Sequence, residues 1–384
     1  MANTIKQKRG TSDPGASDLV VGELAINTTD GGVFTKTDGG TVVEVGSGGG
    51  GASAINDLSD ALTNNSGETI GLGTGALAND DGTDNDNTAL GYNALNANTS
   101  GVQNVGIGHE ALSSNTTGGG LTAIGYRAAA STSAPNQIVA IGAKAFEDYV
   151  GTFSLGFSVA IGQRCAMEAT TPYHLTAVGN AALVTATTGG TFCTVLGSAS
   201  AEALTTATNV TAIGYQALKS VTTGGSNTAV GQQAGGNITT GSNCTVLGSG
   251  ANASSATATN EVTLGNSSVS TLRCNTQTIS SLSDARDKTD VQELPEGLDF
   301  ISKLNPVKFQ WQTRDGNGKD GTYEAGFIAQ ELQSAQQDAD ADYLGLVMDS
   351  NPDRLEASYG KLVPMLVKAI QELKSEVEQL KANV

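Results

Sequence analysis

A serine and a lysine five residues apart, Ser283 and Lys288, are the residues of this chain whose types could break a peptide bond. A neutral lysine can take the proton of a serine hydroxyl, and burial or neighbouring cations favour the neutral amine by lowering its pKa. Arg286 would favour that state, whereas Asp284 and Asp287 would oppose it. The residues alone fit a polar cap on a β–α junction equally well.

Upstream of this pair, twelve glycines recur at intervals of 17 to 20 residues, most often 17. A fixed period of this length indicates a repeat architecture. The residue before each glycine is Leu, Ile or Val, the residue three before is β-branched, and the residue three after is small. The glycines are Gly73, Gly91, Gly108, Gly125, Gly142, Gly162, Gly179, Gly197, Gly214, Gly231, Gly248 and Gly265.

Each repeat predicts a short strand that ends at its glycine, as in Thr122–Gly125. The first and third residues of this strand point to one face, which is therefore apolar, and the glycine indicates a bend or a close backbone approach. One unit is too short to bury that face, so stacked units must share a core, as in a β-solenoid. The alternative is a disordered low-complexity tract, which would not need twelve aliphatic residues in one phase.

The segment Asn87–Leu95, echoed by Asn104–Leu112, carries the repeat in its clearest form. It resembles the head repeats of trimeric autotransporter adhesins. That resemblance implies a homotrimeric parallel β-roll.

The first 46 residues predict three strands, Val20–Asn27, Val33–Lys36 and Thr41–Val45, joined by Asp-Gly-Gly turns. The motif Gly-Glu-Leu-Ala-Ile-Asn followed by hairpins resembles the N-terminal segment of phage tail-fibre proteins. This resemblance implies attachment to a virion tail or capsid protein, and a generic β-meander is the alternative. We interpret residues 47–68 as a Gly-rich linker and a neck helix.

The neck helix is predicted from the helical spacing of Ile55, Leu58 and Leu62. We place the repeat shaft at 69–268, a connector at 269–283, and a separate domain at 284–384, where the composition changes and the only tryptophan occurs.

The last domain resembles the C-terminal intramolecular chaperone of phage endosialidases and tail spikes. The motifs that carry the resemblance are Ser283–Asp290, Leu304–Trp311, Gly326–Leu332 and Tyr359–Pro364. It implies a trimeric chaperone that aligns three chains and then cuts itself off between Ser283 and Asp284. The family's nucleophile and base correspond to Ser283 and Lys288, which makes the chain at most a single-turnover Ser-Lys peptidase.

The cleavage geometry is not evident from the sequence. Attack of the Ser283 hydroxyl on its own carbonyl would form a strained four-membered ring, and attack on the preceding carbonyl would cut before Ser283. A neighbouring chain could take part.

The final segment, 359–384, predicts a coiled coil, because apolar residues alternate at spacings of four and three. Pro364 fits the first turn of that helix. The apolar seam, called the α3 seam below, comprises Tyr359, Val363, Leu366, Ile370, Leu373, Val377, Leu380 and Val384.

Composition excludes several functions. The net charge of −18 disfavours nucleic acid and anionic membranes, and no apolar run is long enough to cross a bilayer. Only His109 and His174 are available as imidazoles, so we expect no metal and no cofactor. We interpret the cysteines as small buried packing residues rather than disulfides or ligands. They are Cys165, Cys193, Cys244 and Cys274.

These features predict a mainly β, elongated homotrimeric fibre with a β-solenoid shaft and a C-terminal α+β chaperone domain. Because no secretory signal is apparent, we expect synthesis in a host cytoplasm and residence in a virion, with binding to a host surface glycan or protein. The alternatives are a tail-spike enzyme that degrades surface polysaccharide and a cellular trimeric adhesin.

Four exposed aromatic positions follow shaft glycines directly, at Tyr92, His109, Tyr126 and Tyr215. They fit either glycan-stacking platforms or scattered surface aromatics.

Overall fold

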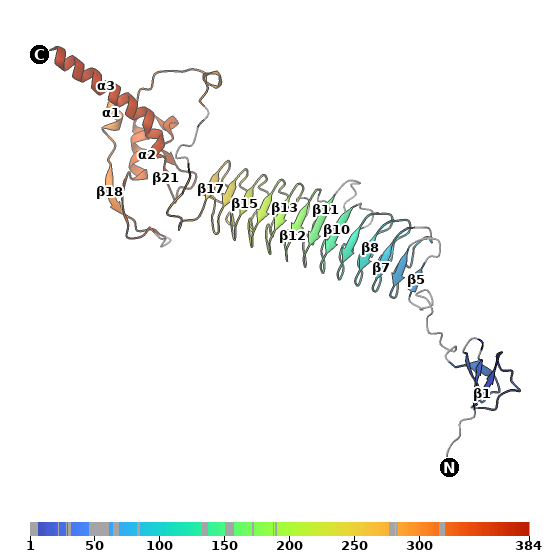
Figure 1. The fold of residues 1–384 in the computed structure, drawn as a ribbon. Helices are drawn as coiled ribbons and strands as arrows, with labels where there is room; N and C mark the ends of the chain where they lie inside the picture. Colours follow the sequence, from blue (N-terminus) through green and yellow to red (C-terminus); the bar gives the residue numbers. More distant parts are fainter. Residues whose placement is uncertain are drawn as a thin grey trace. The chain divides into compact units, whose positions relative to one another are not determined.

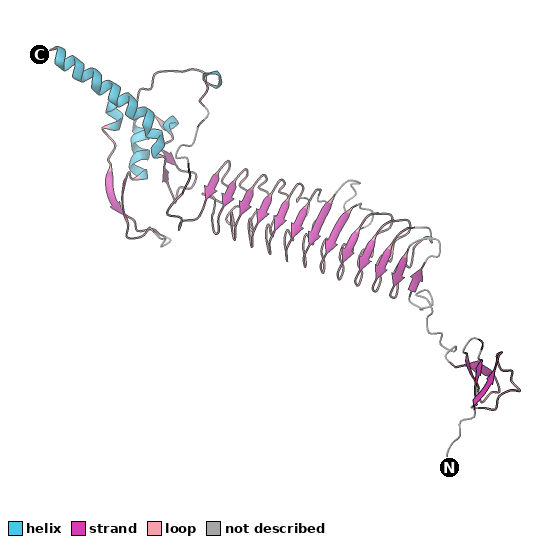
Figure 2. Cartoon of the chain, in the orientation of Figure 1, coloured by secondary structure: helices cyan, strands magenta, loops and turns pink. Residues whose placement is uncertain are grey.

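A computed structural model of the chain describes residues 7–21, 23–27, 29, 32–45, 61–63, 69–82, 85–132, 137–149, 157–170, 173–186, 188, 190–275, 281, 283–314 and 319–383. The chain divides into two compact units, 1–137 and 138–384. Figure 2 shows that strands dominate and that the helices longer than a single turn belong to the C-terminal region. The predicted fold class, mainly β with a solenoid shaft and a C-terminal helix, is confirmed.

The first unit opens with a small sheet in the order β1-β2-β3-β4. Its strands are β1 (Gln7–Gly10), β2 (Leu24–Asn27), β3 (Val33–Lys36) and β4 (Val42–Glu44). The last three pair antiparallel, close to the predicted meander, whereas β1 joins β2 in parallel and was not predicted. Leu19, Ala25 and Phe34 form its core.

The predicted neck helix is wrong at Leu62, which lies in β5 (Ala61–Thr63), a strand that pairs antiparallel with β6. Ile55 and Leu58 lie outside the described residues.

The solenoid strands of the first unit continue with β6 (Ile70–Leu72), β7 (Thr88–Leu90), β8 (Val105–Ile107) and β9 (Thr122–Ile124). In these strands each residue pairs in parallel with its equivalent in the next repeat, as Thr88 does with Val105. Each repeat is therefore one turn of the solenoid (Figure 1).

The second unit adds eight solenoid strands in the same parallel register. They are β10 (Ile138–Ile141), β11 (Ser158–Ile161), β12 (Thr176–Val178), β13 (Thr194–Leu196), β14 (Thr211–Ile213), β15 (Thr228–Val230), β16 (Thr245–Leu247) and β17 (Val262–Leu264).

The shaft glycines are fixed by both conformation and contact. Gly214 has a φ of +133°, and a Cβ atom there would lie 2.4 Å from the carbonyl oxygen of Gly231 in the next turn. The predicted bend with close backbone approach is confirmed. After most of these glycines, residues such as Glu110 (φ +56°) and Leu112 (φ +53°) also take the left-handed conformation. This conformation is tolerated because their amides donate to neighbouring turns, to the carbonyls of Tyr92 at 2.8 Å and Ala128 at 3.0 Å.

The inner face of the strands differs from the prediction. The residue two before the glycine is buried, as in Ala123, Ala212 and Ala229, each 0% exposed. The aliphatic residue directly before the glycine faces outward, for example Leu90 at 48% exposed and Leu264 at 52%. At this strand position the interior takes alanine or valine, as at Val195 (0% exposed), and the turn segments fill the rest of the interior with larger side chains such as Leu112 and Leu218, each 0% exposed. We call the column of residues directly before the glycines the outer aliphatic row.

The cysteine prediction holds for three of the four residues. Cys165, Cys193 and Cys244 are buried in the solenoid interior, and all four thiols are free. Cys274 is exposed, and the prediction is wrong there, because it follows the last turn and has no turn to pack against.

The C-terminal domain combines short helices and two small hairpins. Its elements are η2 (Ala285–Asp287), α1 (Leu298–Ile301), β18 (Val307–Gln310), β19 (Tyr323–Gly326), α2 (Ala329–Asp338), η3 (Asp342–Leu344), β20 (Val347–Met348), β21 (Glu356–Ala357), η4 (Tyr359–Leu362) and α3 (Val363–Ala382). Phe300, Leu344, Leu346, Leu362 and Met365 lie in its core.

Helix α3 carries Pro364 in its first turn, as predicted. It buries Met365 and Ala369 against the domain. The described residues of the α3 seam are on other faces and remain exposed, Ile370 at 66% and Leu380 at 67%.

Candidate functional site

The structure brings the predicted serine and lysine into direct contact. The ammonium nitrogen Nζ of Lys288 donates to Ser283 Oγ at 2.6 Å and lies 3.4 Å from the Ser283 carbonyl oxygen. One lysine therefore contacts both the predicted nucleophile and the carbonyl of the bond predicted to break.

A single turn of 3-10 helix, η2, creates this contact. The Asp284 carboxylate accepts from the backbone N–H of Arg286 at 2.9 Å and caps the turn. The N–H of Lys288 donates to the carbonyl of Ala285 at 3.3 Å. Because the chain turns back within five residues, the Lys288 side chain reaches Ser283. The short polar residue after Ser283 is thus what folds the site locally.

Asp284 and Arg286 form a second pair beside the first. Arg286 Nη2 lies 2.6 Å from Asp284 Oδ2, and Arg286 Nε also donates to the carboxylate at 3.0 Å. This pairing holds the pKa of Asp284 below its usual range. The arginine expected to favour a neutral lysine, and the aspartate expected to oppose it, therefore largely cancel each other.

Solvent reaches the whole junction in a single chain. Ser283, Asp284, Arg286 and Lys288 are all exposed. A lysine is a good base only when the neutral amine is favoured, which requires desolvation or neighbouring cations. Within the described residues of one chain nothing encloses the pair, so the chemistry needs a cover that one chain does not supply.

The arrangement can polarise a carbonyl and move a proton. With its proton, Lys288 can donate to the Ser283 carbonyl oxygen and stabilise negative charge there. Without it, the amine can accept the hydroxyl proton of Ser283. The alternative target, the carbonyl before Ser283, belongs to Leu282, which lies outside the described residues.

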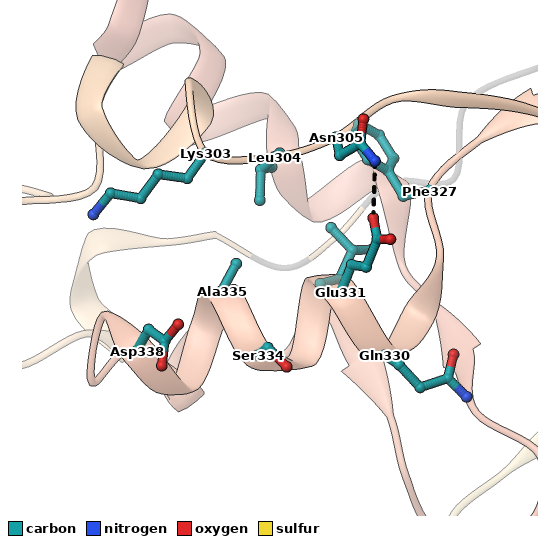
Figure 3. A pocket seen from close by; sticks show the side chains of 10 residues that line it. Lys303, Leu304, Asn305, Phe327, Gln330, Glu331, Ser334, Ala335 and Asp338 are labelled. Carbon is teal, nitrogen blue, oxygen red and sulfur yellow. Dashed lines mark hydrogen bonds between the residues drawn. The ribbon is translucent and has the colours of Figure 1, made fainter.

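Two other motifs of the C-terminal domain, Leu304–Trp311 and Gly326–Leu332, meet around one pocket, shown in Figure 3. Its volume is about 560 Å³, and Leu304, Phe327 and Ala335 are among its apolar lining residues. Asn305 donates to Glu331 at 3.3 Å across it, joining the motif that ends in β18 to the motif that begins α2. Ser283 and Lys288 do not line this pocket.

The motif Tyr359–Pro364 joins the same assembly. The hydroxyl of Tyr359 accepts from the N–H of Phe327 at 3.1 Å, and their rings pack with centroids 5.7 Å apart. A Cβ atom on Gly326 would lie 2.5 Å from the Tyr359 hydroxyl, so only glycine fits beside this tyrosine. Three of the four sequence motifs thus build the domain, while the first builds the junction.

A glycosidase in the shaft would need two carboxylates facing a groove. The shaft offers few acids, for example Glu110, Glu147, Asp148, Glu168 and Glu202, and two of these are held in ion pairs. Glu147 is nearly buried and lies 3.1 Å from Lys144, and Glu110 lies 3.5 Å from Arg127. Such pairing favours a structural carboxylate over a catalytic acid. The remaining candidates, Asp148, Glu168 and Glu202, stay untested as catalytic groups.

Comparison with known proteins bears on the C-terminal domain. Residues 283–341 match the family described as chaperone of endosialidase. The match begins at Ser283, the residue that Lys288 contacts, and spans η2, α1, β18, β19 and α2. No curated protein and no solved structure matches the chain. The resemblance of the shaft to adhesin heads therefore stays a prediction.

The chaperone of endosialidase segment follows directly on the solenoid shaft and its connector, a combination that fits a protein of the tail-fibre type. Among the described residues, no group of three His, Cys, Asp or Glu side chains could hold a metal ion. No described helix is long and apolar enough to cross a bilayer.

The aromatic residues that follow successive shaft glycines were identified from the sequence, but their contact with one another was not predicted. Tyr92, His109 and Tyr126 form a continuous ring stack, with centroids 5.0 and 5.3 Å apart. Their common position after three successive glycines was the available signal, because equivalent residues of successive turns lie side by side.

Proposed function

We propose that this chain is the subunit of a homotrimeric phage fibre whose C-terminal chaperone domain aligns three copies and is then cut off between Ser283 and Asp284. The observation that carries the proposal is the 2.6 Å contact between Lys288 Nζ and Ser283 Oγ at the first residue of the family match. Shaft and chaperone meet at this peptide bond.

Trimerisation is supported by apolar surface that one chain leaves exposed. Between Leu366 and Leu380 the α3 seam places an apolar residue at every third or fourth position, and each is at least 40% exposed. Heptad spacing of this kind is buried by parallel helices of other copies. The outer aliphatic row gives the solenoid a second such surface, with Ile124 at 36% and Val230 at 38% exposed.

The outer aliphatic row and the C-terminal domain differ in whether they can fix the register of three copies relative to one another. Adjacent turns of the solenoid are nearly alike, so three copies that meet along the outer aliphatic row can slip by one turn at little cost. The C-terminal domain occurs once per chain and has no equivalent partner one turn away. Its assembly therefore sets the register before the turns pair, which matters because pairing distant strands is slow and exposes edges that aggregate.

Cleavage in this proposal is a single hydrolysis of the bond between the Ser283 carbonyl carbon and the Asp284 nitrogen. The bond breaks, the carbon gains a hydroxyl, and the Asp284 nitrogen leaves with a proton. The nucleophile is the Ser283 hydroxyl of another copy, which attacks the carbonyl carbon while Lys288 takes its proton and passes it to the leaving Asp284 nitrogen. The ester formed in this way is then hydrolysed by water, which supplies the hydroxyl on the carbon and restores the attacking serine. Assembly encloses the junction, which explains why the pair is solvated in one chain.

Removal of the chaperone makes the fibre kinetically stable, because the element that set the register is no longer there to reverse it. In the finished particle, the N-terminal sheet attaches to a virion tail or capsid protein, and the shaft binds a host surface glycan or protein. The sheet is suited to attachment because it has a core of its own, around Phe34.

Mass spectrometry of the purified full-length protein tests the proposal. We expect a fragment that ends at Ser283, a second that begins at Asp284, and a native mass of three shaft copies. Ser283→Ala should leave the chain whole while native mass still reports a trimer. Intact monomers of the unmodified protein would disprove the proposal.

A further inference from the structure

The ring stack of Tyr92, His109 and Tyr126 lies in the column of residues that directly follow the shaft glycines. The other residues of this column are mostly small or polar. Residues directly after the shaft glycines include Thr74, Ser198, Gln232, Ser249 and Asn266. Three successive turns carry rings at this position only after β7, β8 and β9, where the residues are Tyr92, His109 and Tyr126. An element that merely stabilised stacking would be useful on every turn, and a surface between copies would repeat along the shaft.

The stack is half open to solvent. Tyr92 is 49% exposed, His109 47% and Tyr126 47%. Backbone bonds hold the rings one turn apart, since Glu110 donates to the carbonyl of Tyr92 and Arg127 to that of His109, each at 2.8 Å. The ring planes are inclined by 29° and 31°, so the column fans out and its outer edges stay accessible.

Charged side chains flank the rings on the next position of the same turns. Arg127 Nη1 lies 3.5 Å from Glu110 Oε2, and His109 Nδ1 lies 4.0 Å from the same oxygen. The pair offers several donors and two acceptors while its net charge is zero. Together with two tyrosine hydroxyls, these groups surround a row of aromatic carbon with hydrogen-bonding partners.

We propose that Tyr92, His109 and Tyr126, with Glu110 and Arg127, form a binding site for a neutral saccharide chain that runs along the turns. A sugar ring presents C–H groups, which pack on aromatic carbon, and hydroxyls, which pair with carboxylate and guanidinium groups. The ring spacing is about the length of one pyranose unit, so successive sugars meet successive turns. This inference rests on the proposed role in host attachment and names the ligand class.

A neutral ligand is favoured over an anionic one by charge. Arg127 already lies beside Glu110, and the whole chain carries a net charge of −18, which repels polyanions. A partner protein is disfavoured because the ring stack is small and its neighbours in the column, Thr74 and Ala143, are small residues.

The chain contains a matched control for the site. Tyr215 occupies the same position in its turn and is 48% exposed, yet the residues on either side of it in the column are Ser198 and Gln232. Threonine already occupies the position at Thr74, so Tyr→Thr substitutions are compatible with the solenoid turn.

The test measures binding of the full-length protein to immobilised mannan, dextran and galactan, with alginate as the anionic comparison. Tyr92→Thr and Tyr126→Thr should each weaken binding to a neutral polysaccharide by about tenfold or more, whereas Tyr215→Thr should leave it unchanged. Tyr92→Phe, which keeps the ring, should retain most of the affinity.

Three results would overturn the site: no neutral polysaccharide is bound, alginate is preferred, or Tyr215→Thr costs as much as the other two. Native mass and cleavage are read from the same samples. If the unmodified protein binds no neutral polysaccharide while trimers and cleavage are intact, the result counts against the site alone, and sugar binding by uncleaved monomers of the unmodified protein counts against the proposed assembly alone.

Discussion

Replacing one residue of the α3 seam should prevent correct assembly of the whole chain. Ile370 is 66% exposed in one copy, and in the proposed trimer that surface is buried three times. Full burial of an isoleucine side chain contributes about 1.5–3 kcal/mol, so the exposed two-thirds contributes about 1–2 kcal/mol per copy. Ile370→Ala should thus weaken the trimer by about 3–6 kcal/mol, roughly 10²- to 10⁴-fold in the dissociation constant.

Refolding is the suitable assay, because an assembled shaft could hold three copies together without the seam. The Ser283→Ala chain, which keeps its chaperone, is diluted from denaturant at several concentrations, and the trimer fraction is measured by native mass or sedimentation. Ile370→Ala in that background should shift trimer formation to about ten- to a hundredfold higher concentration, because the midpoint concentration of a monomer–trimer equilibrium varies with the square root of its dissociation constant. Ile370→Asp should abolish it, since three carboxylates would meet in an apolar seam.

The neighbouring residue provides the control. Gln371 is exposed and lies off the seam, so Gln371→Ala should refold like the parent. Equal trimer yields from Ile370→Ala and Gln371→Ala would show that the seam does not join copies, and the register argument would fail with it.

Three further changes test other parts of the structure. Lys288→Met should leave the chain uncut in denaturing mass spectrometry, as Ser283→Ala does, and a cut Lys288→Met chain would remove lysine from the chemistry. Gly214→Ala adds a Cβ 2.4 Å from a backbone oxygen at a φ of +133°, and should destabilise the shaft by about 1–3 kcal/mol per copy in thermal or denaturant unfolding, so an unchanged midpoint would contradict the stacking. In thiol labelling, Cys274 alone should react in the native protein. Burial raises the pKa of Cys165 to about 12, so this buried thiol should stay unlabelled between pH 7 and 9, where an exposed thiol ionises and reacts faster; labelling of Cys165 in that range would indicate an open interior.

Much of the shaft could be predicted because its spacing is a direct consequence of its geometry. One strand per repeat, a glycine at a bend with close backbone approach, and a small residue three positions later follow from stacking. Which strand face lies inside could not be predicted by the same reasoning. Ala123 and Ile124 are both apolar, and hydrophobicity favours burying the larger residue, but Ala123 is the one inside, beside larger buried residues such as Leu112 that come from the turns.

Buried polar groups were also beyond sequence reasoning. Asn104 is fully buried, with its amide donating to Gly118 at 2.8 Å and its oxygen accepting from Leu121 at 3.0 Å. An asparagine in a Gly- and Thr-rich segment looks like a loop residue, and only the next turn, 17 residues later, provides these partners.

The candidate site was predicted through residue types and a family resemblance, and its geometry was not. Ser283 and Lys288 were named from their spacing and motif, but their contact depends on the turn that Asp284 caps. Arg286 shows what could not be predicted. Its charge was expected to act on Lys288, whereas its guanidinium group is hydrogen-bonded to the Asp284 carboxylate. The sequence identifies the charged residues near the site, whereas the fold of the η2 turn determines which of them are in contact.

The exposed apolar surfaces explain why this chain would carry a domain that it later discards. Each solenoid turn has a core of its own, yet it leaves the outer aliphatic row exposed, and in the proposed trimer the other copies would cover that surface. The same regularity that lets turns stack also makes a shifted alignment almost as favourable as the correct one. Only a non-repeating element can distinguish the two, and here it begins where the repeats have ended, at Ser283. In the proposed assembly that element has no further role once the turns are aligned, and a cut between Ser283 and Asp284 would remove it without breaking a single solenoid turn.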